Sequence, residues 1–193
     1  MAHPQFVERL EKNDRTVESP FSPRNVMNNA YFKPPFRVAP EREEVFISEI
    51  LRMKIGKDYY PGDSATSENW PGSAPGTKGI FNAISPKYCN LNAFSEIDPK
   101  PPVLWIRGCA DVVVSNDTMD RGRLGRRGAF GEAWPGEEIF PPQPMISQLY
   151  ALLDTYYRRG GRYREVVLNC GHSPHIEKPE TFRQEFLRFL GGQ

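Results

Sequence analysis

The chain has 193 residues, 38% of them hydrophobic, and a formal net charge of +1. These values are typical of one ordinary globular domain with a buried core, and the balanced charge does not favour nucleic acid as a partner. No apolar run approaches the ~18 residues of a membrane-spanning helix, and charged residues stand where a signal peptide would be apolar. We therefore expect a cytoplasmic protein with neither a nucleic-acid nor a membrane partner.

The first half of the sequence predicts two helices on either side of an irregular segment. Residues 4–13 have the apolar spacing of a short amphipathic helix, with a proline near its start. Prolines recur through residues 19–40 and exclude one continuous helix there. Residues 41–55 have acidic residues in the first turn, apolar residues largely on one face and Gly56 at the end, which predicts a second helix.

Residues 57–100 are rich in Pro, Gly, Ser and Asn and predict a long loop with aromatic residues interleaved. A loop of this length inside a compact domain is usually functional. The aromatic residues either pin the loop to the core or line a pocket for a small apolar substrate. Four of them are the candidate substrate-binding residues: Tyr59, Tyr60, Trp70 and Phe81.

The second half predicts two apolar strands, residues 102–108 and 163–171, with a helix over 143–161 between them. Strand, helix and strand in this order form a parallel crossover unit, and nearly continuous apolar strands are typical of a sheet covered on both faces. A last helix over 178–190 is expected to face inward with Phe182, Phe186, Leu187 and Leu190. Because two parallel strands do not make a sheet, we expect the tail of a larger α/β fold, or a partner that supplies the rest.

A carboxylate and an imidazole follow the two predicted strands. Asp111 comes three residues after Gly108, and His172 directly follows Gly171. The carboxyl ends of parallel strands meet at one edge of the sheet, so Asp111 can reach His172. Such a carboxylate fixes the tautomer of the imidazole and leaves its other nitrogen as a base. A purely structural Asp–His pair at a turn is the alternative.

The sequences of these two turns are distinctive. Residues 108–114 read GCADVVV, and residues 171–180 read GHSPHIEKPE. They resemble the α/β-hydrolase family, in which the acid follows the seventh strand as G-x-x-D-x-[VI]-[VP] and the histidine follows the eighth as G-H-x-[PA]-x-x-E-x-P-E. The resemblance implies that Asp111 and His172 are the acid and the histidine of a Ser-His-Asp triad.

The same resemblance implies a domain organisation and a fold class. Residues 1–99 correspond in position to the cap, or lid, of many such hydrolases, here with helices and loops rich in Pro, Gly and aromatic residues. Residues 100–193 correspond to the C-terminal part of the hydrolase domain, with an insertion at about 115–142. The expected fold is α/β, a partial α/β-hydrolase fold in which a mainly helical and loop cap precedes the last two parallel strands and their helices. The insertion carries a basic cluster, read as a solvated face or an anion site: Arg121, Arg123, Arg126 and Arg127.

The chain departs from the family at the nucleophile. The family carries its serine on a strand-to-helix elbow, G-x-S-x-G, and that pattern is absent from this sequence. The resemblance therefore implies hydrolysis of an ester, an amide or a similar acyl bond only when another segment supplies the serine, and some members of the family cleave C–C or C–halogen bonds instead. Partners would be an N-terminal hydrolase half or a second copy of the chain. The alternatives are a non-catalytic remnant that binds an apolar ligand and a subunit that completes another chain's sheet.

Neither a cofactor nor a metal is expected. Cys170, His172 and His175 form C-x-H-x-x-H, but a fourth metal ligand is not evident and the hydrolase turn explains two of the three positions better. The three cysteines are an odd number with wide spacing, which argues against a disulfide framework. We expect Cys89, Cys109 and Cys170 to be small buried apolar residues, and Cys170 to lie at a strand end, facing the sheet rather than acting as a nucleophile.

Overall fold

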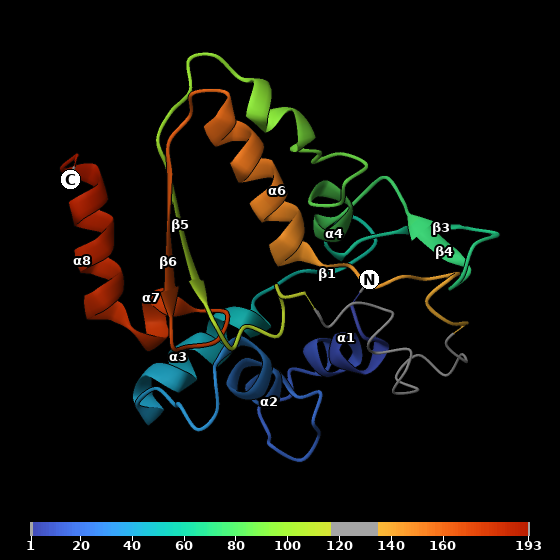
Figure 1. Ribbon diagram of the computed structural model, residues 1–193. Helices are drawn as coiled ribbons and strands as arrows, with labels where there is room; N and C mark the ends of the chain where they lie inside the picture. The colour runs from blue at the N-terminus through green and yellow to red at the C-terminus, as the bar shows by residue number, and fades with distance from the viewer. Residues whose placement is uncertain (1, 117–134, 193) are drawn as a thin grey trace. The chain divides into compact units, whose positions relative to one another are not determined.

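The computed structural model of the protein describes residues 2–116 and 135–192 (Figure 1), which divide between two compact units. Within the described residues, the first unit holds 2–27, 37–91 and 135–141, and the second holds 28–36, 92–116 and 142–192. Each unit is thus made of separate stretches of the chain, and residues 28–36 belong to the second unit. Most of the expected insertion, with its four arginines, lies outside the described residues.

Three helices of the first unit begin at prolines, whose missing N–H costs nothing in the first helical turn. They are α1 (Pro4–Glu11), α2 (Pro23–Val26) and α3 (Pro40–Leu51). The two predicted helices are confirmed, but α3 ends four residues earlier than expected because Ile55 pairs with Tyr60. A π-helical turn, η1 (Met27–Tyr31), follows α2 within the segment expected to be irregular.

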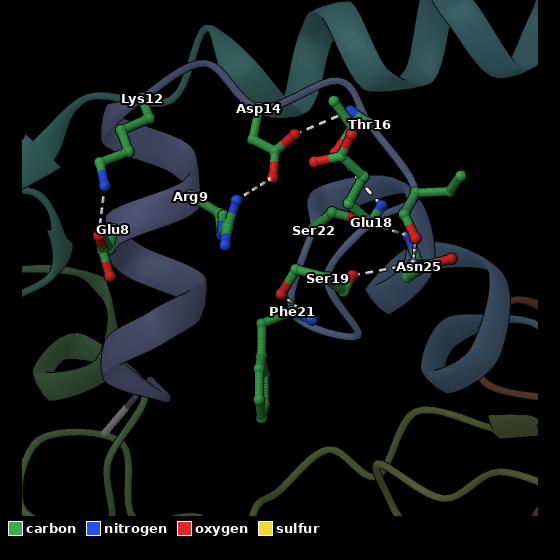
Figure 2. A network of polar contacts seen from close by, with 11 residues as sticks. Glu8, Arg9, Lys12, Asp14, Thr16, Glu18, Ser19, Phe21, Ser22 and Asn25 are labelled. Atoms are coloured by element: carbon green, nitrogen blue, oxygen red, sulfur yellow. Dashed lines mark hydrogen bonds and ion pairs between the residues drawn. The ribbon is translucent and has the colours of Figure 1, made fainter.

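Side-chain hydrogen bonds hold the turns between α1 and α2 (Figure 2). The carboxylate of Asp14 accepts from the Arg9 guanidinium at 3.2 Å and from the Thr16 N–H at 2.8 Å. The Asn25 amide donates to the carbonyls of Val17 and Ser19 at 2.9 and 2.8 Å. Such local bonds replace a backbone ladder in a segment that proline keeps out of regular structure.

Residues 57–100 are less irregular than the sequence predicts. A first short strand, β1 (Ile55–Gly56), comes just before them. Residues 57–100 themselves contain three more short strands and two helical turns: β2 (Tyr60–Pro61), β3 (Ser64–Thr66), β4 (Ser73–Pro75), α4 (Ile80–Ala83) and η2 (Asn92–Glu96). Strands of two or three residues are too short for an alternating pattern to be read. Gly62 and Gly79 have positive φ angles of 109° and 87°, and a Cβ on Gly79 would lie 2.2 Å from the Cα of Gly62. Only glycine allows this approach.

The second unit is built on a parallel pair of strands, β5 (Val103–Gly108) and β6 (Tyr163–Leu168). The crossover between them contains α6 (Met145–Arg158), and after β6 the chain forms the short α7 (Pro174–Glu177) and then α8 (Pro179–Leu190). Figure 1 shows α6 and α8 on opposite sides of the strand pair. The predicted crossover is confirmed, and the protein is of the α/β class.

Tyr156 is the centre of the second unit's core. Its side chain is fully buried, and its ring stacks on that of Phe94 with centroids 5.0 Å apart. The hydroxyl donates to the carbonyl of Pro101, just before β5. A Cβ on Gly161 would lie 2.2 Å from the ring, so glycine is needed there too. One side chain of α6 therefore fixes η2 and the start of β5.

The apolar face of α8 is not buried as expected. Phe186, Leu187 and Leu190 are 44%, 53% and 63% exposed. The expectation was wrong because it presumed a wide sheet, and two strands are too narrow to cover a helix of three turns. No described helix is long and apolar enough to cross a membrane.

The outer edge of β5 is open. The Val103 N–H donates to the carbonyl of Arg162, just before β6, and the Cys109 N–H donates to that of Leu168, at the end of β6, both at 2.9 Å. Because successive residues of a strand point their backbone groups to alternate edges, those of Leu104 and Ile106 point away from β6. Within residues 2–116 and 135–192 no further strand pairs with this edge.

Candidate active site

Asp111 and His172 lie on two turns that touch at the carboxyl ends of β5 and β6. A Cβ on Gly108 would lie 2.0 Å from the carbonyl oxygen of Gly171 and 2.4 Å from that of Cys170, so the contact requires glycine. The Ala110 N–H donates to the Cys170 carbonyl at 3.1 Å and continues the pairing past the strands. The strands thus bring together two residues that are 61 positions apart in the sequence.

The predicted contact between the two side chains is confirmed. Asp111 Oδ2 lies 2.9 Å from His172 Nδ1, and Asp111 Oδ1 accepts from the N–H groups of Val113 and Val114 at 2.7 and 2.9 Å. The Asp111 side chain is 8% exposed and the His172 side chain 35%. Since an ionised carboxylate only accepts, Nδ1 of His172 carries a proton and Nε2 of the neutral ring is a proton acceptor.

The environment keeps Asp111 ionised. Burial acts to raise the pKa of Asp111, but the hydrogen bonds from His172, Val114 and Val113 outweigh it, and the pKa lies below its usual value. The carboxylate is therefore charged at neutral pH.

The histidine turn is held by residues that sequence reasoning missed. The His172 N–H donates to the Tyr31 carbonyl at 2.9 Å, and the buried Glu177 carboxylate accepts from the N–H groups of Gly171 and Lys33, both at 2.8 Å. The Tyr31 ring lies 5.6 Å from the His172 ring. Glu177 stands in the quoted turn motif, but one of its two partners, Lys33, lies 144 residues earlier, and nothing in the sequence connects the two.

The four candidate substrate-binding residues lie in the first unit. Trp70 and Phe81 line a cavity of about 360 Å³, to which Phe140 also contributes. Tyr59 and Tyr60 line a second, more open hollow of about 490 Å³. The rings also pack on one another, with centroids 4.8 Å apart for Trp70 and Phe140 and 5.2 Å for Tyr60 and Phe81. These residues therefore both pack together and line hollows.

The cysteines only partly follow the expectation. Cys170 is buried, and burial, together with the nearby Glu177, raises the pKa of its thiol to about 11, so it is a protonated thiol at neutral pH. Cys89 and Cys109 are exposed, contrary to the prediction, because both lie in turns outside the core. His175 is exposed and packs beside Phe182, 5.9 Å between ring centroids. In the described ranges no group of three His, Cys, Asp or Glu residues could hold a metal ion.

A nucleophile is not found beside the Asp–His pair: in the part of the chain that the structure describes, no hydroxyl or thiol is hydrogen-bonded to Nε2 of His172. Comparison of the chain with protein-family models, with curated proteins and with solved structures finds no match.

Proposed function

We propose that the chain carries the acid and the base of a Ser-His-Asp triad for hydrolysis of an ester, an amide or a similar acyl bond, with the serine supplied by another segment. The observation that carries the proposal is the 2.9 Å hydrogen bond between buried Asp111 and the partly exposed His172. The resemblance of both turns to the α/β-hydrolase family supports it, and the fold would then be the C-terminal part of such a hydrolase, preceded in the sequence by a cap.

In this reaction Nε2 of His172 takes the proton of the serine hydroxyl while the serine oxygen attacks the acyl carbon. Asp111 stabilises the imidazolium that forms, and the imidazolium then returns the proton to the leaving alcohol or amine. Water hydrolyses the acyl-enzyme by the same proton path. This chain would thus supply two of the three triad residues, Asp111 and His172. The substrate would be a small apolar acyl compound.

Two features of the second unit support a nucleophile from elsewhere. The open edge of β5 offers the backbone groups of Leu104 and Ile106 to a further strand, and exposed edges of this kind pair readily. The exposed apolar residues of α8 would be covered by a wider sheet. An N-terminal hydrolase half would pair with the edge of β5 and also cover the apolar residues of α8. A second copy of the chain, or the sheet of another protein, could pair with the same edge instead.

The test is labelling with a fluorophosphonate, which reacts covalently with activated serines. The chain purified alone is expected to take no label and to give no turnover of p-nitrophenyl acetate. A serine-bearing partner that co-purifies with it is expected to be labelled, and His172→Ala should slow that labelling by about 10²- to 10⁴-fold, the usual contribution of a general base.

His175→Ala is the matched control, because His175 is three residues away, exposed and not bonded to Asp111. It should leave labelling unchanged. Label on a residue of this chain itself, or partner labelling that is insensitive to His172→Ala, would show that the proposal is wrong.

The cavity of the first unit favours a second candidate function, the binding of a small neutral ligand without catalysis. Its volume of about 360 Å³ lies in the range of small-molecule sites. Three aromatic rings contribute apolar walls, and its carboxylate, Asp63, already accepts hydrogen bonds from Thr77, Lys78 and Asn82. A compound with one apolar ring and a hydroxyl group fits this lining.

A further inference from the structure

Glu177 is a buried carboxylate without a cationic partner. Its residue is 6% exposed, and in the described part of the chain no Lys, Arg or His forms an ion pair with it. A buried charge is costly unless hydrogen bonds compensate for it. Here both oxygens are used, Oε1 by the Gly171 N–H and Oε2 by the Lys33 N–H. An apolar residue in its place would leave both N–H groups without an acceptor, so the carboxylate is what ties Gly171 to Lys33.

The bonds of Glu177 form part of a clamp around the histidine turn. Residues 31–33 lie against the turn so closely that a Cβ on Gly171 would be 2.7 Å from the Lys33 nitrogen and 2.9 Å from the Tyr31 oxygen. The Tyr31 carbonyl accepts from the His172 N–H on one flank, and the Glu177 carboxylate links Gly171 to Lys33 on the other. The two peptide groups that precede the His172 Cα are therefore fixed.

We propose that Glu177 is a positioning residue for His172, acting through Gly171 and residues 31–33. A fixed backbone sets where the imidazole lies relative to Asp111, and so keeps the proton on Nδ1 and Nε2 in one place. Displacements of about 1 Å in such sites cost about 10²-fold in rate. The inference rests on the proposed function, in which His172 is the base, but its geometry can be tested without any reaction.

The test is Glu177→Gln. The side chain keeps its volume, but its amide nitrogen is a donor and opposes one of the two backbone N–H groups, so one bond of the clamp is lost. Glu180→Gln is the matched control, because Glu180 is 74% exposed and pairs only with Arg183, three residues on. The readout is NMR of imidazole nitrogens in the whole chain, where His172 is one of three histidines.

In the wild type and in Glu180→Gln, His172 is expected to hold the Nδ1–H tautomer, with its Nδ1 proton protected from exchange by Asp111. In Glu177→Gln we expect mixed tautomers and exchange of that proton faster by about tenfold or more, the effect of losing one buried hydrogen bond. Backbone signals of β5 and β6 should stay in place.

Unchanged tautomer and exchange in Glu177→Gln, with both altered in Asp111→Asn, would overturn the proposal. So would general loss of dispersed backbone signals, because Glu177 would then support the whole unit rather than one side chain. The failure of the proposed function is seen separately, since it concerns labelling of a serine and the NMR experiment needs no nucleophile.

Discussion

Replacing Asp111 by Asn tests whether the carboxylate stabilises the folded chain through His172. Asn can keep one oxygen on the Val113 and Val114 N–H groups, which lie 2.7 and 2.9 Å from Asp111 Oδ1. Its NH₂ group then meets His172 Nδ1, so the ring must change tautomer to accept. What is lost is one charge-assisted hydrogen bond at a site 8% exposed to water, worth about 1.5 to 3 kcal/mol.

The assay is urea unfolding of the two chains over a range of pH. At neutral pH, Asp111→Asn should lower the free energy of unfolding by the amount above. The folded pKa of Asp111 lies below its usual value of 3.8, so between these two values the unfolded chain binds more protons than the folded chain. The stability that the carboxylate gives is present above that range and is lost as the pH falls through the folded pKa. The difference between the chains should therefore narrow below about pH 4.

Asp154→Asn provides the comparison, because Asp154 is in the same unit and exposed, with one bond of 3.2 Å from the Tyr163 hydroxyl. It should change the free energy of unfolding by less than about 0.5 kcal/mol. A loss in Asp111→Asn that is no larger than in this control, or that does not depend on pH in the acid range, would refute the argument for an ionised, buried acid.

Two further predictions concern the core of the second unit and the cavity of the first. Tyr156→Ala should lower the free energy of unfolding by about 3 to 5 kcal/mol, because it empties a fully buried site. Tyr156→Phe removes only the hydrogen bond to Pro101 and should lower it by about 0.5 to 1.5 kcal/mol. Urea unfolding that shows the same loss of stability in both variants would contradict this. Saturation-transfer NMR should detect p-cresol bound in the first-unit cavity, with binding about fivefold weaker in Phe81→Ala and unchanged in Phe182→Ala of the second unit. Equal binding by both variants would exclude this cavity as the site.

The parts of the fold that could be predicted are those with local, periodic signals. The apolar runs gave β5 and β6 to within a few residues, and the prolines and apolar spacing gave α1, α3, α6 and α8. Two glycine-marked turns were enough to predict that Asp111 meets His172, because parallel strands bring their carboxyl ends together.

The parts that could not be predicted depend on distant contacts. The pairing of Ile55 with Tyr60 and the hairpin of β3 and β4 involve two or three residues each, below the length at which a pattern is visible. The exposure of Leu187 depends on how wide the sheet is, which the helix's own sequence does not state. Glu177 has an ordinary place in a helical turn, and its burial follows only from residues 31–33 packing against that turn.

The clamp on the histidine turn also has a consequence for the order of folding. The bond from the Lys33 N–H to Glu177 joins residues separated by 144 positions. Closing so long a loop costs entropy before its contacts are gained, and structures that rely on distant contacts form slowly. Residues 31–33 leave the ribosome long before their partners are synthesised. The Asp–His pair would therefore acquire its final geometry among the last steps of folding, after Glu177 has been synthesised.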